Sequence, residues 1–331
     1  MTKLTRSIAT LILLTLCVVN SALAAADLPS WRDSAAKERI VSFVQKVTQQ
    51  GSADYVPVEQ RIAVFDNDGT LWSEQPAYVQ LVYLLDRVKA LAPHHPEWKN
   101  QQPFKGILEN DMHAVAATGN QGLMAIEHAA DAGMTTEDFK ASVTQWLQTA
   151  RHPRFNRPYT ELVYQPMLEL LSYLRANGFK TYIVSGGGTD FMRPWTEKIY
   201  GIPPEQVIGS TDKVKFDIGK DGKPRLIKQG AINFIDDGDN KPVAINRYIG
   251  RMPIFAFGNS DGDLPMLQYV SAGAKNALVL YLHHDDAQRE YAYDRKSSFG
   301  RLDKGLDEAK KQGWPVVSMK SDWNTVFPQS Q

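Results

Sequence analysis

Two aspartates, Asp66 and Asp68, follow a short apolar run and are the residues best placed to do chemistry. Side chains two residues apart on an extended segment face the same way, so both carboxylates address one point. Carboxylates that close repel each other unless a cation or a shared proton relieves the repulsion. The pair therefore predicts a site that combines a bound cation with one carboxylate as nucleophile and the other as general acid and base.

A glycine-rich turn follows a second apolar run. Ser185 and the glycines at 186–188 come directly after residues 181–184 and before a predicted helix at 190–200. Glycines at such a turn leave the backbone N–H groups open to an anion, and the serine adds a hydroxyl donor. By itself this pattern indicates an anion site only weakly, because many strand-to-helix turns contain glycine.

An acidic turn, Gly-Asn-Ser-Asp-Gly-Asp, follows a third apolar run at residues 258–263. Its candidate metal ligands are Asn259, Asp261 and Asp263. Hard oxygen ligands without histidine or cysteine favour Mg²⁺ over zinc. Asp261 is equally well explained as a residue that forms the turn.

Lys241 begins a predicted helix at residues 240–248. An ammonium group there can neutralise a phosphate or the nucleophilic carboxylate. Lys228 and Lys213 are competing choices for this role, and a solvated surface lysine is the alternative to all three.

The elements that must position these residues follow an α/β pattern. Short apolar runs typical of buried parallel strands alternate with amphipathic helices, and they lie at residues 61–65, 181–184, 253–257 and 277–282. Ligands of open α/β sheets bind at the carboxyl ends of the strands, where the polar turns lie. An Asp-Gly turn at 221–222 between apolar flanks predicts a β-hairpin over about 210–235.

The spacing of the motifs predicts two domains in the mature chain. Residues 27–75 and 160–331 form the α/β core domain, and residues 76–159, with helical periodicity throughout, form an inserted helical cap domain. The long separation of Asp66 from Ser185 leaves room for this insertion.

Residues 1–26 have the pattern of a signal peptide, with Lys3 and Arg6 before an apolar stretch and Ala-Leu-Ala at 22–24 as the cleavage site. The apolar stretch is shorter than the roughly 20 residues that span a membrane, although an uncleaved anchor is the alternative. The single cysteine, Cys17, lies within this segment. We therefore expect a periplasmic or secreted protein without disulfides and without stable membrane association after cleavage.

The composition narrows the class of partner. The 331-residue chain has 37 Lys and Arg against 37 Asp and Glu, a formal net charge of +0. A chain with this balance lacks the excess of basic residues that binds nucleic acid, so we expect no nucleic-acid partner. The sequence does not indicate an oligomeric state.

Together these motifs resemble the haloacid dehalogenase superfamily, most closely its phosphoserine-phosphatase-like phosphohydrolases. The resemblance covers about residues 61–282, and Asp66-x-Asp68-Gly69-Thr70 after an apolar strand is its most specific part. It implies a Rossmann-like parallel sheet core with a helical cap, as in the fold of that superfamily.

The resemblance also implies a mechanism. Asp66 is expected to attack phosphorus and form an aspartyl-phosphate, and Asp68 to act as general acid and base. Mg²⁺ is expected against Asp66 and the Asp68 carbonyl, with the acidic turn completing its shell. The residues expected to hold the phosphoryl oxygens are Ser185, Gly186, Lys241 and, through its hydroxyl, Thr70.

The expected function is therefore a Mg²⁺-dependent phosphomonoesterase that acts on a small organic phosphate. Asp68 favours phosphoryl transfer over dehalogenation, because the dehalogenase branch lacks that acid. Asn259 stands where the family usually has Asp, and Gln75 stands at the offset of a substrate-reading Glu, with Glu74 one residue earlier. A phosphotransferase to an alcohol acceptor and a non-catalytic binding protein on the same scaffold are the alternatives.

Two other features carry weaker expectations. Trp72 follows the nucleophile loop and is a candidate for the entrance of the site, with packing in the core as the alternative. The pair His283-His284 lacks a third ligand and is expected to consist of surface or interface histidines.

Overall fold

A computed structural model describes residues 28–329 of the chain and shows one twisted sheet with helices on both faces. The strand order is β4-β3-β2-β1-β5-β6-β7, and β8 also pairs with β6. The strands are β1 (Ile62–Phe65), β2 (Lys180–Gly188), β3 (Val207–Ile218), β4 (Pro224–Phe234), β5 (Phe255–Gly258), β6 (Leu278–Asp285), β7 (Ala292–Tyr293) and β8 (Val316–Ser318). The expected Rossmann-like α/β core is confirmed.

The pairing explains why the polar turns meet. β1 lies between β2 and β5 in parallel register, with Phe65 opposite Ile183 on one side and Phe257 on the other. Strands that are parallel and in register end at the same edge of the sheet, so the turns that follow them lie side by side. The antiparallel pairs, β3 with β4 and β6 with β7, lie toward the outside of this parallel centre.

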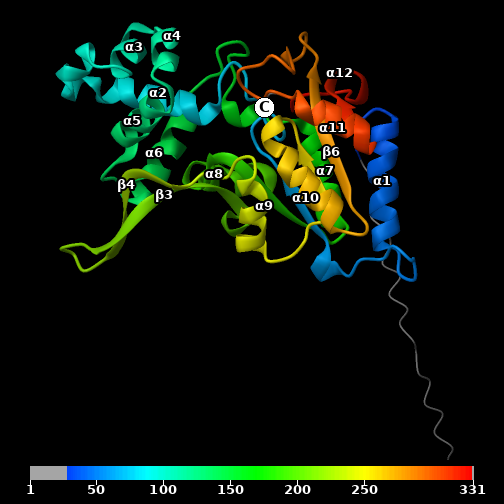
Figure 1. Cartoon of the computed structure of the whole chain (residues 1–331). Helices are drawn as coiled ribbons and strands as arrows, with labels where there is room; N and C mark the ends of the chain where they lie inside the picture. The colour runs from blue at the N-terminus through cyan, green and yellow to red at the C-terminus, as the bar shows by residue number, and fades with distance from the viewer. Residues whose placement is uncertain (1–27, 330–331) are drawn as a thin grey trace, which may run out of the picture.

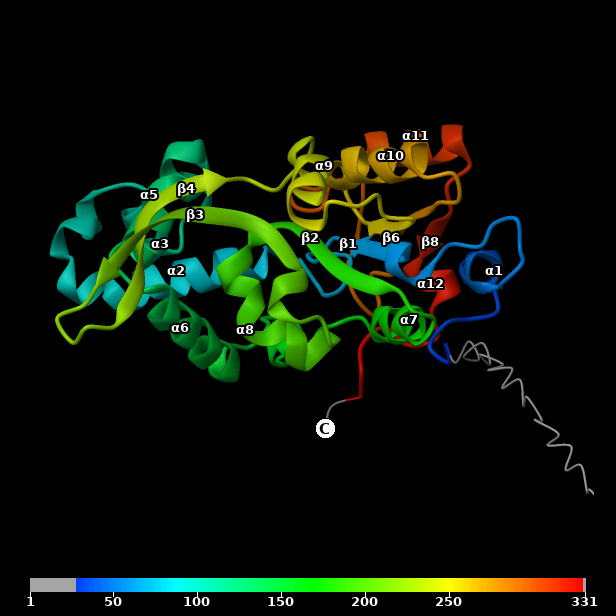
Figure 2. The same ribbon diagram turned by 90° about the horizontal axis from the view of Figure 1, so that it is seen from below.

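Alternation along β1 divides the core into two layers. Ile62 and Val64 pack with one set of buried residues, whereas Ala63 and Phe65 pack with the other. All four are buried, as expected for a strand covered on both faces. Figure 2 shows α9 (Asn240–Ala244), α10 (Leu264–Gly273) and α11 (Lys304–Gln312) on one face of the sheet.

The other face is covered by α1, α7 and α12, and α8 continues along it toward the inserted helices (Figure 2). Their bounds are α1 (Ala35–Thr48), α7 (Gln165–Ala176), α8 (Thr189–Tyr200) and α12 (Met319–Asp322). α1 buries Ile40, Val44 and Val47, one stripe at helical spacing.

The segment between β1 and α7 is helical and forms one end of the molecule (Figure 1). Its helices are α2 (Val79–Leu91), α3 (Phe104–Glu109), α4 (Met112–Ala117), α5 (Gly119–Asp131) and α6 (Thr136–Thr149). This is the helical content that we expect of a cap, while the limits of the two domains stay a prediction.

The hairpin of β3 and β4 belongs with this helical end rather than with the sheet centre (Figure 1). β4 packs against α5 and α6, and the backbone of Lys228 exchanges two hydrogen bonds with the loop between those helices, at Gly133 and Met134. The predicted Asp-Gly hairpin is confirmed, and it brings residues that follow the core strands in sequence into contact with the inserted helices.

The predicted signal peptide at 1–26 lies outside the described residues. Within residues 28–329, no helix has the length and apolar character that crossing a membrane requires.

Candidate active site

The site is built at the carboxyl edge of the parallel strands. Asp66 follows β1 directly, and its backbone N–H donates to the Phe257 carbonyl at 3.0 Å, which extends the pairing by one residue. A cavity of about 310 Å³ opens here, between the core and the helical end. The expected site residues that line it are Asp66, Asp68, Ser185, Gly186 and Lys241.

Lys241 is the buried cation of the site. Its Nζ lies 2.7 Å from Asp66 Oδ1 and 2.6 Å from Asp263 Oδ1, and it donates to the Val184 carbonyl at 3.0 Å. The side chain is only 2% exposed, so these charges attract each other through a medium of low dielectric. Lys241 therefore occupies the position beside the nucleophile that the sequence left open among three lysines.

Asp66 has two other carboxylates near it, those of Asp68 and Asp263, and one buried lysine, Lys241. Burial is the main cause that raises the pKa of its carboxyl well above the usual range, and Asp263 adds to the shift while Lys241 opposes it. Lys241 contacts Oδ1 of this carboxyl and leaves its other oxygen without that contact.

Asp68 is held by a tryptophan. Trp72 Nε1 donates to Asp68 Oδ1 at 2.9 Å, and the Trp72 ring stacks on Trp195 with 4.4 Å between ring centroids. Trp72 is buried, so its candidate place at the entrance is wrong, because the ring packs under the loop. Burial raises the pKa of Asp68 to about 6, against the lowering effect of the Trp72 hydrogen bond.

The glycine-rich turn continues β2 past Ser185 in extended conformation. Ser185 Oγ is buried and accepts from the Gly187 N–H at 3.1 Å. A Cβ atom built on Gly187 would lie 3.3 Å from Asp68 Oδ2 and 3.4 Å from Ser185 Oγ. The turn therefore approaches Asp68 closely, and a larger residue at this point would fill the space between Asp68 and Ser185.

The acidic turn positions other site residues. Asp263 Oδ2 accepts from the N–H groups of Asn259 and Ser260, at 2.9 and 3.0 Å, while its Oδ1 binds Lys241. Thr70 differs from the expected phosphate contact: its hydroxyl is fully buried and donates to Asn259 Oδ1 at 3.1 Å. Asp263 and Thr70 thus fix Lys241 and Asn259, and neither is among the residues that line the cavity.

Asp261 turns away from Asp66. Its Oδ1 accepts from the N–H groups of Asp303 and Gly305, both at 2.9 Å, at the start of α11. These bonds favour the turn-forming role of Asp261 over the metal-ligand role that the sequence left equally open.

Glu74 is the site residue whose role the sequence did not reveal. It lines the cavity, is 1% exposed, and its Oε1 accepts from Asn259 Nδ2 at 2.7 Å and from the Tyr293 hydroxyl at 2.8 Å. Burial raises the pKa of this carboxyl well above its usual value. Its contacts with Asn259 and Tyr293 join segments that are far apart in sequence, so no local sequence pattern predicts these contacts.

A buried histidine supports the loop that contains Asp66 and Asp68 from behind. His284 Nε2 lies 2.7 Å from the Gly69 carbonyl, and its Nδ1 lies 3.1 Å from Glu290 Oε2. The imidazole ring therefore joins this loop to Glu290 through both of its nitrogens. His284 is 2% exposed, so the expectation of a surface histidine is wrong, because β6 places it beneath the loop.

The donor chemistry fits a hard divalent cation. Asp66, Asp68 and Glu74 line the cavity, and Lys241 is the only basic residue among the described residues that do so. Oxygen donors with an excess of negative charge are what Mg²⁺ requires. Within residues 28–329, no three His, Asp or Glu side chains form a ready-made metal cluster, so a site here would combine carboxylate, amide and backbone oxygens.

Comparisons with known proteins agree on the fold. The family model of haloacid dehalogenase-like hydrolases matches residues 63–268. A conserved functionally unknown protein from Anaerococcus prevotii has a TM-score of 0.52 at 16% identity, over 86% of this chain and 91% of its own.

Two further solved structures are similar at lower TM-scores. A phosphoserine phosphohydrolase-like protein from Francisella tularensis has a TM-score of 0.37 at 16% identity, over 76% of this chain and 99% of its own. A probable phosphoserine phosphatase from Vibrio cholerae has a TM-score of 0.37 at 16% identity, over 73% and 63%. No curated protein matches this chain.

Proposed function

Because the chain belongs to the haloacid dehalogenase-like hydrolase family, we propose that it is a phosphomonoesterase that hydrolyses a small organic phosphate through an aspartyl-phosphate. The observation that carries this proposal is the contact of the buried Lys241 with Asp66 at 2.7 Å, on a cavity that Asp68 and Ser185 also line. A nucleophile, an acid, a hydroxyl donor and a cation at one cavity are the parts that phosphoryl transfer needs.

In the first step, the free oxygen of Asp66 attacks phosphorus, and the bond from phosphorus to the leaving oxygen breaks. Asp68 donates its proton to that leaving oxygen. Its pKa of about 6, raised by burial, keeps a protonated fraction at neutral pH and lets the same group act as a base afterwards. In the second step, Asp68 takes a proton from water, which attacks phosphorus and releases Asp66 and phosphate.

Three groups are placed to hold the phosphoryl oxygens. Ser185 offers a hydroxyl and Gly186 an exposed backbone segment at the cavity wall, while Lys241, whose three N–H groups donate to Asp66, Asp263 and the Val184 carbonyl, adds its positive charge. Fixed donors of this kind stabilise charge as it moves in the transition state. Lys241 in addition holds Asp66 in one orientation.

We propose Mg²⁺ as the cofactor, held by the Asp66 carboxylate, the Asp68 backbone carbonyl and the Asn259 side chain, with Glu74 beside Asn259. The cation would polarise the phosphoryl group and offset the negative charge of the site. The excess of carboxylates at the cavity supports this assignment.

The test is phosphate release from a panel of phosphomonoesters, with Mg²⁺ and after treatment with EDTA. We expect metal-dependent release by the wild-type protein and none above background by Asp66→Asn. Release that EDTA leaves unchanged would contradict the cofactor, and equal release by the variant would contradict the nucleophile. An added alcohol that accepts phosphate in place of water would indicate a phosphotransferase.

We also propose that the protein is exported to the periplasm or secreted, on the basis of the basic and apolar pattern of residues 1–26. N-terminal sequencing of the protein purified from its own cells tests this proposal. A mature chain that begins just after residue 24 is expected, and one that retains residue 1 would contradict it.

A further inference from the structure

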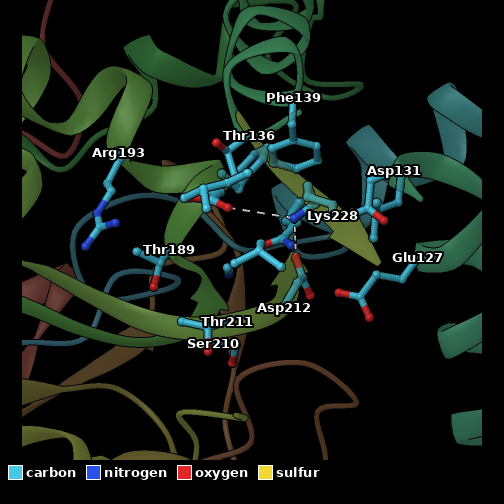
Figure 3. Close-up of a pocket in the computed structure, with 17 residues that line it drawn as sticks. Glu127, Asp131, Thr136, Phe139, Thr189, Arg193, Ser210, Thr211, Asp212 and Lys228 are labelled. Carbon is cyan, nitrogen blue, oxygen red and sulfur yellow. Dashed lines mark hydrogen bonds and ion pairs between the residues drawn. The ribbon is translucent and has the colours of Figure 1, made fainter. Parts of the chain in front are cut away.

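A second cavity of about 200 Å³ adjoins the active-site cavity, between the β3–β4 hairpin, α8 and the inserted helices (Figure 3). The two cavities share part of their walls, so a molecule bound at Asp66 can extend from one into the other. The residues that line both are Gln80, Leu84, Glu127, Gly188, Ser210, Thr211 and Asp212.

The second cavity is negatively charged. Its acidic residues are Glu127, Asp131, Asp190 and Asp212, and its basic residues are Lys228 and Arg193. Four acids against two bases give a formal excess of two negative charges when all of them are ionised. A ligand that enters this cavity is therefore selected for positive charge.

Lys228 shows how the cavity holds an ammonium group. Its Nζ lies 3.2 Å from Asp131 Oδ2 and 3.8 Å from Asp190 Oδ2, and it makes a closer contact with Asp212. The same Nζ lies 4.3 Å from the centroid of the Phe139 ring, within range of a cation–π interaction. Carboxylates and one aromatic face thus surround an alkylammonium group in this cavity, which is the side chain of Lys228 itself.

One carboxyl oxygen of Asp131 and the carboxyl group of Glu127 remain after the contacts of Lys228 are accounted for. Asp131 is 2% exposed, and its Oδ1 is buried with no hydrogen-bond partner among the described residues. A buried acceptor without a donor costs free energy that a ligand N–H would recover. Glu127 points into the cavity in Figure 3, and burial, with the charges of Asp212 and Asp131, raises its pKa to about 7.

The active-site cavity is lined in part by apolar side chains. Leu81 and Leu84 of α2, Leu123 of α5 and Ile232 of β4 line it, whereas the wall that the two cavities share is mostly polar. Apolar walls favour methylene groups, because burying apolar surface is favourable. Apolar side chains in one cavity and acidic residues where it meets the other match a chain of methylenes that ends in a cation.

We propose that the second cavity binds the leaving group of the substrate, and that this group is an alkylammonium, so that the substrate class is the aminoalkyl phosphates. Glu127 and the free oxygen of Asp131 accept hydrogen bonds from the ammonium, while the phosphate lies at Asp66. The inference rests on the proposed phosphomonoesterase function and adds its specificity.

The experiment compares matched pairs of substrates. Each ω-aminoalkyl phosphate, with two to six carbons, is paired with the alkyl phosphate in which a methyl group replaces the ammonium, and kcat/KM is measured at mildly alkaline pH. Charge-assisted hydrogen bonds predict a preference of roughly 10–100-fold for the charged member of the best pair. The chain length with the largest preference reports the reach from Asp66 to Glu127.

Two variants locate the preference. Glu127→Gln should reduce the charged-to-neutral ratio by about tenfold, because one charged partner is lost. Glu127→Lys should reverse the preference. The control is Glu109→Gln, an exposed carboxyl on α3 outside both cavities, which should leave the ratio unchanged.

Equal kcat/KM for charged and neutral members in the wild type would overturn the inference, as would a Glu127→Gln ratio equal to that of the wild type. The proposed function fails separately, if no phosphomonoester of the general panel is hydrolysed. Hydrolysis of the panel with no preference for ammonium would leave the phosphatase standing and reject the substrate class alone.

Discussion

Two lysines of this protein are almost completely buried, and each is surrounded by carboxylates, yet their surroundings differ. Lys241 contacts Asp66 and Asp263, and both contacts lie within the core. Lys228 contacts Asp131 of α5, Asp190 of α8 and Asp212 of β3, so it joins three separate elements. Burial of a charge is tolerated in both places because it is paired.

The difference distinguishes a lysine at the proposed reaction centre from a lysine that holds structural elements together. Lys241 touches Asp66, the proposed nucleophile, so we expect its removal to affect the reacting atoms. Lys228 ties the β3–β4 hairpin to α5 and α8, through its side chain and through backbone bonds at Gly133 and Met134. Burial and ion pairing alone therefore do not identify a catalytic lysine. The residue with which the lysine pairs distinguishes the two cases.

The largest expected effect comes from replacing a carboxylate that contacts one of the two lysines. Asp66→Asn should lower kcat by roughly 10⁴-fold or more, as loss of a catalytic nucleophile does. Asp131→Asn removes a carboxylate that touches the other lysine and should leave kcat for methyl phosphate within about tenfold. Phosphate release measures both, and circular dichroism verifies the folds. A loss of similar size in both variants would mean that the two lysine sites are equivalent.

Replacing the lysines themselves comes next. Lys241→Met should reduce kcat by about 10²–10³-fold, because a preorganised positive charge and the partner of Asp66 are lost together. The measurement is phosphate release from methyl phosphate, with Lys228→Met as the matched control. If the two variants retain the same activity, Lys241 is not the phosphoryl-binding cation.

Lys228→Met should act on stability instead. Removing one partner of a buried ion pair typically lowers the free energy of unfolding by about 3–5 kcal/mol. Partial exposure of Asp190 and Asp212 places the expected loss at the lower end of that range. Urea unfolding monitored by fluorescence measures it, and protection of the β3–β4 amides from hydrogen exchange should fall. Unchanged stability would show that Lys228 does not hold the hairpin.

The smallest effect concerns Asp236, a carboxyl near Lys241 that the lysine does not satisfy. Both its oxygens are buried without hydrogen-bond partners in the described part of the chain, and burial raises its pKa from 3.8 to about 7. The folded protein thus favours the protonated form, and this stability is complete below about pH 4 and is lost as the pH rises toward 7.

Asp236→Asn should therefore raise the free energy of unfolding above neutral pH by about 2 kcal/mol, because burying a charged group without a partner costs more than burying a neutral one. The gain should shrink toward pH 4, where the wild-type carboxyl is protonated and resembles the amide. Urea unfolding of both proteins across this range measures the difference. A gain that does not depend on pH would contradict the titration of Asp236.

Local sequence was a reliable guide where one strand and its following turn contain the information. The run before Asp66 became β1, the run before Ser185 became β2, and the run before Asn259 became β5. The meeting of these turns was predictable as well, because parallel strands in one sheet share an edge. The hairpin was visible in its Asp-Gly turn, although its packing against α5 and α6 was not.

Predictions failed where side chains find partners across the fold. Trp72 donates to Asp68 under a ring stack with Trp195, and His284 lies beneath Gly69 rather than on the surface. Such contacts depend on packing between distant segments, which hydrophobic periodicity does not encode. Glu74 was noted for its offset from Asp66, but its bonds to Asn259 and Tyr293 emerge only in three dimensions.

The sequence by itself thus determined the strands, the order of the motifs and the types of residue at the reaction centre, because these follow from local patterns of apolar and polar residues. The tertiary structure alone decided which buried lysine meets the nucleophile, and that the inserted helices and the hairpin enclose an acidic cavity beside it. The physical reason is that an ion pair or a cavity wall is a relation between elements, and only their packing brings its members together.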